Sequence, residues 1–318
     1  MIARFTVQPE ALALAHLDLP LRLAQTDEVL RFWRDHGVLV VPPPFAEAVR
    51  SLPQNQRKRW YAALASALKR RQLFGPLANL AKQVQLSFVS PDWFIIKDLG
   101  DIASIEDCQL GCEACRIDCL GQSDVVQQLW KTRAGEFSER TPCDDIWDRC
   151  FSRPVNHAAN IAIMDRYAGQ DLLKHKPERQ SGFHSLLKRL PQKSNECHLK
   201  LYTGFAEGGN EYGTKSDVIA AVEAAVGYLL PTGYTFTLYL AEDCIFGAQF
   251  HYRYFRFDQS WCLKTDAGLA ILEGPDLWRR STYNFETVSD EHLQAENRFT
   301  SEFVTMALEI RKSVACAA

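Results

Sequence analysis

The first half of the chain alternates amphipathic segments with short apolar ones. Residues 26–36 are predicted to form a helix, because Thr26 is a suitable cap and acidic residues occupy the first turn. The apolar run 38–41 precedes three prolines, which is typical of a short buried strand. A second amphipathic helix with basic ends is predicted over 55–73, and the segment 85–97 is predicted to be extended.

After Pro154 the pattern changes to strands that alternate with helices. Apolar runs predict strands at 159–164, 198–202, 234–240, 249–258, 261–264 and 269–272. Helical periodicity predicts helices at 182–190 and 215–229, and a long final helix at 290–314. This order predicts an α/β (α+β) domain, in which helices cover the faces of a mixed sheet.

Length and composition indicate two domains. A chain of 318 residues with 47% hydrophobic residues can bury a substantial core. We predict a helix-rich amino-terminal domain over 1–153 and a second domain over 154–318. The longest apolar run, 218–230, contains Glu223 and is too short to cross a bilayer, and the first residues do not predict a signal peptide. We therefore expect a cytoplasmic protein without a membrane span.

The net charge of −3 conceals two blocks of opposite sign. Residues 48–91 contain eight basic and no acidic residues, whereas residues 98–148 contain twelve acidic and four basic residues. A dense basic block is typical of a surface that binds nucleic acid or an anionic membrane. The candidate nucleic-acid-binding residues are Arg57, Lys58, Arg59, Lys69, Arg70 and Arg71. Alternatively, the two blocks face each other within the fold or at a subunit interface.

Four of the ten cysteines lie within twelve residues, at Cys108, Cys112, Cys115 and Cys119. Without an export signal, cysteines predict reduced thiols or metal ligands rather than disulfides. Structural zinc, or alternatively an iron–sulfur cluster, requires four thiolates that converge on one point. In a straight helix the outermost thiols would lie about 16 Å apart, so a helix would instead bury the cysteines as small hydrophobic residues.

The most unusual segment is 250–258, because charged residues stand among its aromatic ones. His251, Arg253 and Asp258 form the pattern His-x-Arg-x4-Asp, and Arg256 and Lys264 add nearby positive charge. Arginine binds phosphate through a planar fork, and histidine is a nucleophile near neutral pH. Asp165 and Arg166 follow a predicted strand, where an α/β sheet places ligands, although a structural salt bridge is equally compatible with them.

The order of these segments resembles the phospholipase D-like domain. The closest version is the carboxy-terminal domain of proteins with a microtubule-interacting-and-transport (MIT) domain, together with its prokaryotic relatives. The resemblance covers only the second half of the chain. It rests on Asp165-Arg166-Tyr167, on Thr203, on His251-Tyr252-Arg253-Tyr254, and on Trp261, Lys264 and Gly268-Leu269. Tyr252 stands where that family usually has aspartate, and the superfamily signature His-x-Lys carries arginine here.

The resemblance implies a metal-independent phosphodiesterase. His251 would attack phosphorus, Arg253 would hold the phosphate oxygens, and Asp258 would orient the imidazole, while the ligand-binding candidates are Asp165, Arg166, Arg256 and Lys264. Because the chain has one such motif, catalysis would require a homodimer that faces two copies. This scheme predicts a nuclease, such as a prokaryotic defence effector. The alternative is a catalytically inactive module that binds anionic lipid, nucleic acid or a protein, with the amino-terminal domain as a second partner-binding region.

Overall fold

The computed structural model describes residues 2–7, 20–41, 45–74, 93–97, 113–174, 180–206, 213–244, 253–303 and 306–313. The chain divides into two compact units, Met1–Arg133 and Ala134–Ala318. This division precedes the expected boundary at Pro154, because strand β6 (Ala134–Phe137) pairs with β12 of the second unit. Among the helices of the described residues, none combines the length and the apolar character that crossing a membrane requires.

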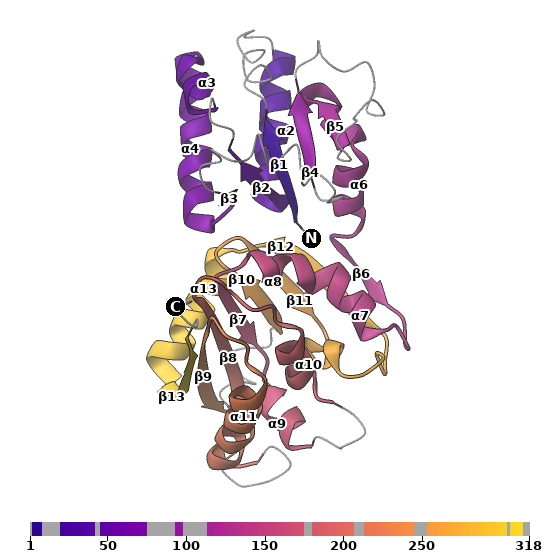
Figure 1. Cartoon of the computed structure of the whole chain (residues 1–318), viewed down its shortest axis with the longest axis vertical. Coiled ribbons are helices and arrows are strands. Elements are labelled where there is room, and N and C mark those ends of the chain that lie inside the picture. Colours follow the sequence, from indigo (N-terminus) through magenta and orange to yellow (C-terminus); the bar gives the residue numbers. More distant parts are fainter. Residues whose placement is uncertain are drawn as a thin grey trace, which may run out of the picture. The chain divides into compact units, whose positions relative to one another are not determined.

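The first unit contains a parallel sheet, so the expectation of a merely helix-rich domain was incomplete. Its five described strands are β1 (Ala3–Val7), β2 (Gly37–Val40), β3 (Leu73–Phe74), β4 (Trp93–Lys97) and β5 (Glu113–Arg116), in the order β3-β2-β1-β4-β5. All neighbouring strands are parallel. The helices are α2 (Pro20–His36), α3 (Phe45–Ser51), α4 (Gln54–Arg70), the 3₁₀ helix η3 (Ile117–Gln122) and α6 (Asp124–Lys131) (Figure 1).

Aromatic rings fill the core of the first unit. Phe5 of β1 contacts the Phe32 ring edge-on, with centroids 5.4 Å apart, and Trp60 of α4 lies 6.2 Å from Trp33 of α2. Gly37 allows this packing, since a Cβ atom there would lie 2.6 Å from the Phe5 ring. The expected extended segments 38–41 and 85–97 overlap β2 and β4, whereas β1, β3 and β5, of five, two and four residues, were not predicted.

The second unit contains a mixed sheet of eight described strands, in the order β13-β9-β8-β7-β10-β11-β12-β6. Its further strands are β7 (Asn160–Met164), β8 (Cys197–Phe205), β9 (Tyr234–Glu242), β10 (Tyr254–Phe257), β11 (Trp261–Thr265), β12 (Ser281–Thr287) and β13 (Met306–Lys312). β7, β8 and β9 are parallel, and the other neighbours are antiparallel. The predicted α/β class, a mixed sheet flanked by helices, is therefore confirmed.

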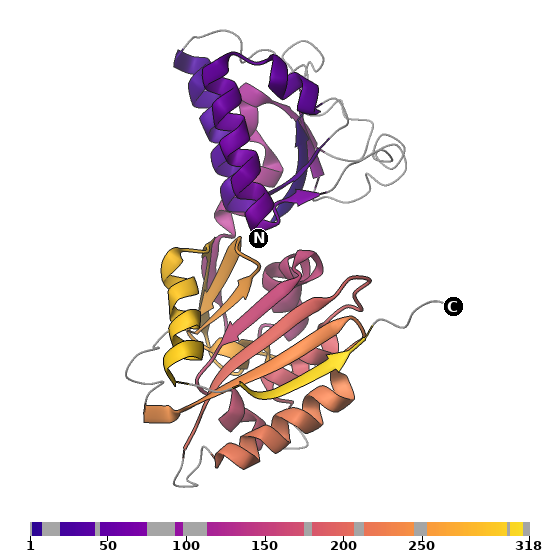
Figure 2. The same cartoon turned by 90° about the vertical axis from the view of Figure 1, so that its left-hand side faces the viewer.

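The helices of the second unit cover both faces of this sheet (Figure 2). They are α7 (Cys143–Ile146), the π-helical turn η4 (Trp147–Phe151), α8 (Ser152–His157), α9 (Ala168–Leu173), α10 (Gly182–Arg189), α11 (Lys215–Leu229), the 3₁₀ helix η5 (Gly268–Leu272), α13 (Asp290–Arg298) and the π-helical turn η6 (Phe299–Phe303). Tyr254 belongs to the apolar cluster that Leu293 of α13 contacts. Its neighbour Phe255 points to the opposite face and contacts Phe151 of η4, with centroids 4.8 Å apart.

Two predicted elements of the second unit were wrong. Residues 269–272 lie in η5 rather than in a strand, and the predicted final helix stops at Arg298, with strand β13 following η6. The segment Met306–Lys312 pairs with β9, so sheet pairing outweighed the helical propensity of its alanine, leucine and glutamate.

Candidate functional site

The register of the sheet places the end of β7 beside the start of β10. The two strands are antiparallel, and Tyr254 pairs with Met164. Asp165, which follows β7, and Arg253, which precedes β10, therefore lie at the same edge of the sheet. β7 is also the point from which the parallel strands and the antiparallel strands extend in opposite directions. Ligands of open α/β sheets bind at such an edge.

Asp165 anchors this edge. Its side chain is buried, and its Oδ1 and Oδ2 accept hydrogen bonds from the amides of Tyr167 at 3.0 Å and Leu269 at 2.6 Å. Burial raises the pKa of Asp165 above the usual aspartate value, although both amides and the charge of Arg253 act in the opposite direction. Gly268 has a φ of 60°, and this turn directs the Leu269 amide at the carboxylate.

Tyr167 lies against two guanidinium groups. The guanidinium carbons of Arg253 and Arg166 lie 4.5 Å and 5.3 Å from its ring centroid. Arg166 is neutralised by Asp243, which accepts two hydrogen bonds of 2.5 Å from it. Arg253 donates from Nη1 to the Asp266 carbonyl at 2.7 Å and has no ion pair with a carboxylate of the described residues. Its remaining N–H groups are therefore suitable donors for an anion.

Asp171 of α9 adds a second acid to this edge. Burial, with the charges of Asp165 and Glu273, raises the pKa of Asp171 to about 7, while Arg253 and Lys174 oppose the shift. Its carboxyl group therefore exists in both protonation states near neutral pH. We call Asp165, Tyr167, Asp171 and Arg253 the edge site.

Two predicted phosphate ligands lie elsewhere. Arg256 forms a buried, two-pronged ion pair with Glu296 of α13, at 2.5 Å and 2.6 Å, on the face opposite to Phe255. Lys264 contacts Glu286 at 2.5 Å. Burial opposes the charged form of Arg256, but the Glu296 carboxylate raises the pKa of Arg256 above its usual value. Both cations are used within the fold, so the structure does not bring them to the edge site.

Asp258 also lies apart from Arg253. Arg253 precedes β10 and Asp258 follows it. Five residues of extended chain therefore separate the two by about 16 Å. The Asp258 carboxylate accepts hydrogen bonds from the amides of Ala159 at 3.2 Å and Asn160 at 2.9 Å. Asp258 therefore has a role in the turn before β7, whereas His251, whose imidazole it was predicted to orient, lies outside the described residues.

Several predicted residues lie outside the described residues, namely His251, Cys108 and Cys112. Of the other cysteines in the cluster, Cys115 is buried in β5 and Cys119 lies in η3. The alternative of one continuous helix is therefore wrong for this part of the segment. Zinc binding by the cluster stays a prediction.

The predicted nucleic-acid-binding residues occupy the two ends of α4, as expected. Arg57, Lys58 and Arg59 lie in its first turns, while Lys69 and Arg70 lie in its last turn and Arg71 caps it. About 18 Å separates the two clusters along the helix. Arg59 forms an exposed ion pair with Asp27 of α2, at 2.8 Å.

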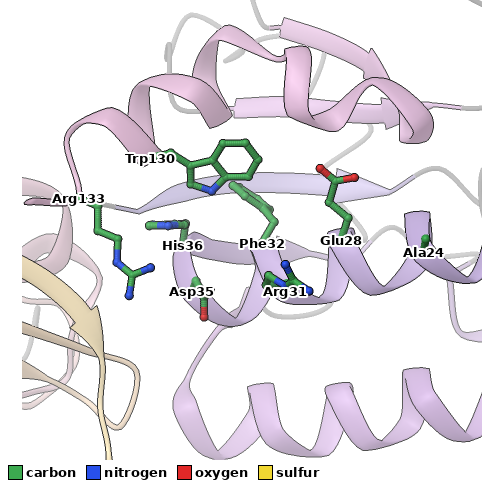
Figure 3. Close-up of a pocket in the computed structure, with 8 residues that line it drawn as sticks. All are labelled: Ala24, Glu28, Arg31, Phe32, Asp35, His36, Trp130 and Arg133. Atoms are coloured by element: carbon green, nitrogen blue, oxygen red, sulfur yellow. The ribbon is translucent and has the colours of Figure 1, made fainter.

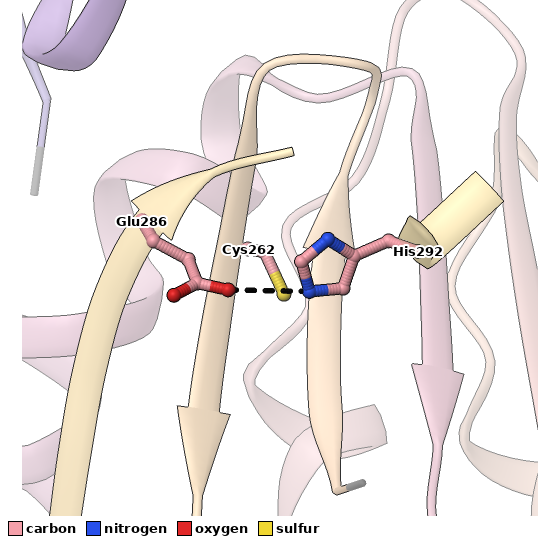
Figure 4. A group of neighbouring side chains, drawn as sticks. All are labelled: Cys262, Glu286 and His292. Atoms are coloured by element: carbon pink, nitrogen blue, oxygen red, sulfur yellow. Dashed lines mark ion pairs between the residues drawn. The ribbon is translucent and has the colours of Figure 1, made fainter. Parts of the chain in front are cut away.

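A second group of side chains deserves comparison with metal centres (Figure 4). Cys262, Glu286 and His292 place one ligand atom each within 4.8 Å of one another, and Glu286 lies 3.2 Å from Nε2 of His292. However, the Ser289 amide donates to Nδ1 of His292 at 3.1 Å, so the proton of the neutral ring is on Nε2. Burial lowers the pKa of His292, which favours this neutral ring. The arrangement caps α13 and leaves Nε2 protonated, which does not suit a metal ligand.

Two residues of the sheet edge were absent from the sequence prediction. Asp243 follows β9 closely, so the rule that selected Asp165 could have selected it too. Asp171 has no comparable signal, because its perturbed pKa results from burial and from charges that are distant in sequence.

No protein-family model matches the chain, and no curated protein matches it significantly. The phospholipase D-like resemblance therefore rests on the residues described above.

Proposed function

We propose that this protein is a metal-independent phosphodiesterase of the phospholipase D-like type that cleaves nucleic acid at the edge site. The observation that supports the proposal is the placement of Arg253. Its guanidinium is held by Tyr167 and the Asp266 carbonyl, and it forms no ion pair with a carboxylate of the described residues. A fixed planar cation of this kind suits the two non-bridging oxygens of a phosphodiester.

In this scheme, His251 is the nucleophile, as its position two residues before Arg253 suggests. A ring nitrogen forms the bond to phosphorus, and the bond to the leaving oxygen breaks with its electron pair. Asp171, with a pKa of about 7, gives that oxygen its proton. Water then cleaves the phosphohistidine and returns a proton to Asp171.

A proton donor within the same chain changes the argument for a homodimer. If Asp171 supplies the proton, one chain contains both the nucleophile and the acid. A dimer remains our expectation from the single motif, and light scattering of the active species tests it. Activity of a monomeric species would favour Asp171 as the donor.

The second candidate is an inactive module that binds an anion. Its support is that Asp258, Arg256 and Lys264 serve the fold, which leaves Arg253 as the predicted phosphate-binding cation of the edge site. Such a module would bind through Arg253 without turnover.

The decisive experiment incubates the purified chain with single-stranded DNA, duplex DNA and RNA in EDTA. We expect cleavage that His251→Ala abolishes and Arg253→Gln lowers by about a hundredfold or more, the scale of a lost transition-state contact. Arg279→Gln is the matched control, because Arg279 is exposed and stacks on Trp278. Binding of substrate without cleavage would support the inactive module, and unchanged cleavage by His251→Ala would overturn the proposed mechanism.

A further inference from the structure

The first unit contains a pocket of about 440 Å³ between α2 and α6 (Figure 3). This volume falls within the range of pockets that bind small molecules. Its wall is partly aromatic, formed by Trp130, Phe32 and His36. Phe32 and His36 are buried with ring centroids 6.3 Å apart, whereas Trp130 remains 44% exposed at the opening. An accessible indole beside buried rings offers a flat surface on which a planar ligand can stack.

Charged groups surround this aromatic wall. Arg31, Arg133 and Glu28 line the pocket, together with Asp35. Arg34 already neutralises Asp35, through hydrogen bonds of 2.7 Å and 3.1 Å. Arg31 forms no ion pair among the described residues, so its guanidinium is a suitable donor for an anion. The carboxylate of Glu28 can accept hydrogen bonds from amino groups of the same ligand.

We propose that this pocket binds a nucleoside monophosphate, with its base on Trp130 and its phosphate beside Arg31. A nucleotide combines the two properties that the lining selects, a planar aromatic ring and a compact anion. Inorganic phosphate lacks the ring, and a nucleoside lacks the charge, so each should bind much more weakly.

Calorimetric titration of the full chain tests this site. The probes are the four common ribonucleoside monophosphates, with adenosine and inorganic phosphate as partial ligands. Trp130→Leu should weaken binding of the preferred nucleotide about tenfold or more, since a base–aromatic stack contributes on that scale. Arg31→Gln should lower the affinity for the nucleotide but leave the affinity for the nucleoside unchanged.

Matched controls separate this pocket from general effects. Trp278→Leu removes another exposed indole, in the second unit, and should bind the nucleotide like the original chain. Arg279→Gln removes an exposed arginine of the second unit and should do the same. Absence of binding by all four nucleotides at millimolar concentration would overturn the inference, as would equal affinity in the Trp130→Leu variant. Circular dichroism checks that both pocket variants fold.

Discussion

The backbone at Gly268 approaches the buried carboxylate of Asp165 so closely that a Cβ atom there would lie 2.2 Å from Oδ2. This contact follows from the hydrogen bond that the Leu269 amide donates to the same oxygen, at 2.6 Å. The glycine therefore serves the edge site directly. It lets the chain pass close to an acid that is shielded from water.

Replacing Gly268 with alanine should destabilise the protein. The left-handed backbone costs an alanine about 1–2 kcal/mol, and relief of the clash must also move Asp165. Gly227→Ala is the control, because a Cβ atom in that helix would meet nothing within 4 Å, and it should stabilise by about 0.5–1 kcal/mol. Urea unfolding measures both changes. Equal stability of Gly268→Ala and the original chain would contradict the close contact.

The ion pair of Arg256 and Glu296 provides a second prediction. Removing one partner of a buried pair leaves an uncompensated charge, so Glu296→Leu alone should lower the free energy of unfolding by about 3–5 kcal/mol. The double variant with Arg256→Met should recover much of this loss, because it removes both charges. Additive losses in the double variant would show that the pair is not coupled. Anion binding by the double variant would confirm that Arg256 serves the fold.

Asp171 predicts an unusual dependence of stability on pH. Its pKa rises to about 7 on folding, so the folded state retains a proton that the unfolded state releases near pH 4. This acid therefore costs stability progressively as the pH rises from about 4 to about 7, and the buried Asp165 acts with the same sign. Asp171→Asn should match the original chain near pH 4 and exceed its stability increasingly up to pH 7.

Asp217 is a control of opposite sign. Its hydrogen bonds with Thr214 at the start of α11 lower the pKa of Asp217. Its contribution to the stability of the folded state is therefore present at neutral pH and disappears on acidification. Asp217→Asn should thus be less stable than the original chain at neutral pH, with a difference that closes in acid. Unfolding in urea across this pH range follows both variants. A pH-independent difference for Asp171→Asn would refute the raised pKa.

Some elements could be predicted from neighbouring residues alone. Helix α11 was predicted with its observed bounds from its helical periodicity, and in the structure Thr214 and Asp217 form a capping box at its start. Strands β7 and β8 were located from their apolar residues, which are continuous in β7 and alternate with His198 and Lys200 at the start of β8. Asp165 was selected because it follows such a strand, a rule that needs no knowledge of the partner strand.

Long-range pairing explains what the sequence could not show. Arg256 and Lys264 stood in a charged segment that suggested phosphate, yet the acids that neutralise them are Glu296 and Glu286, which come later in the chain. No local pattern encodes such a pairing. The same limit applies to β13, whose helical propensity yields to a neighbouring strand.

The cysteine cluster predicts that the protein binds zinc. Chain purified under reducing conditions should contain about one zinc ion, and combined replacement of Cys108 and Cys112 by serine should remove it. His292→Gln should retain the metal, because Nε2 of His292 carries a proton in the capped helix. Elemental analysis decides the point. Absence of metal from the original chain would indicate reduced thiols, and loss of metal in His292→Gln would instead locate it at Cys262 and Glu286.

The ends of α4 predict unequal contributions to nucleic-acid binding. Lys58 has no ion pair among the described residues, whereas Arg59 contacts Asp27 at 2.8 Å and must give up that partner to reach a phosphate. Lys58→Gln should therefore lower the slope of log affinity against log salt by about one, and Arg59→Gln should lower it less. Fluorescence anisotropy with a labelled oligonucleotide measures these slopes. Lys215→Gln, an exposed lysine of the second unit, should leave the slope unchanged. Identical slopes for all three variants would show that α4 does not contact the phosphates.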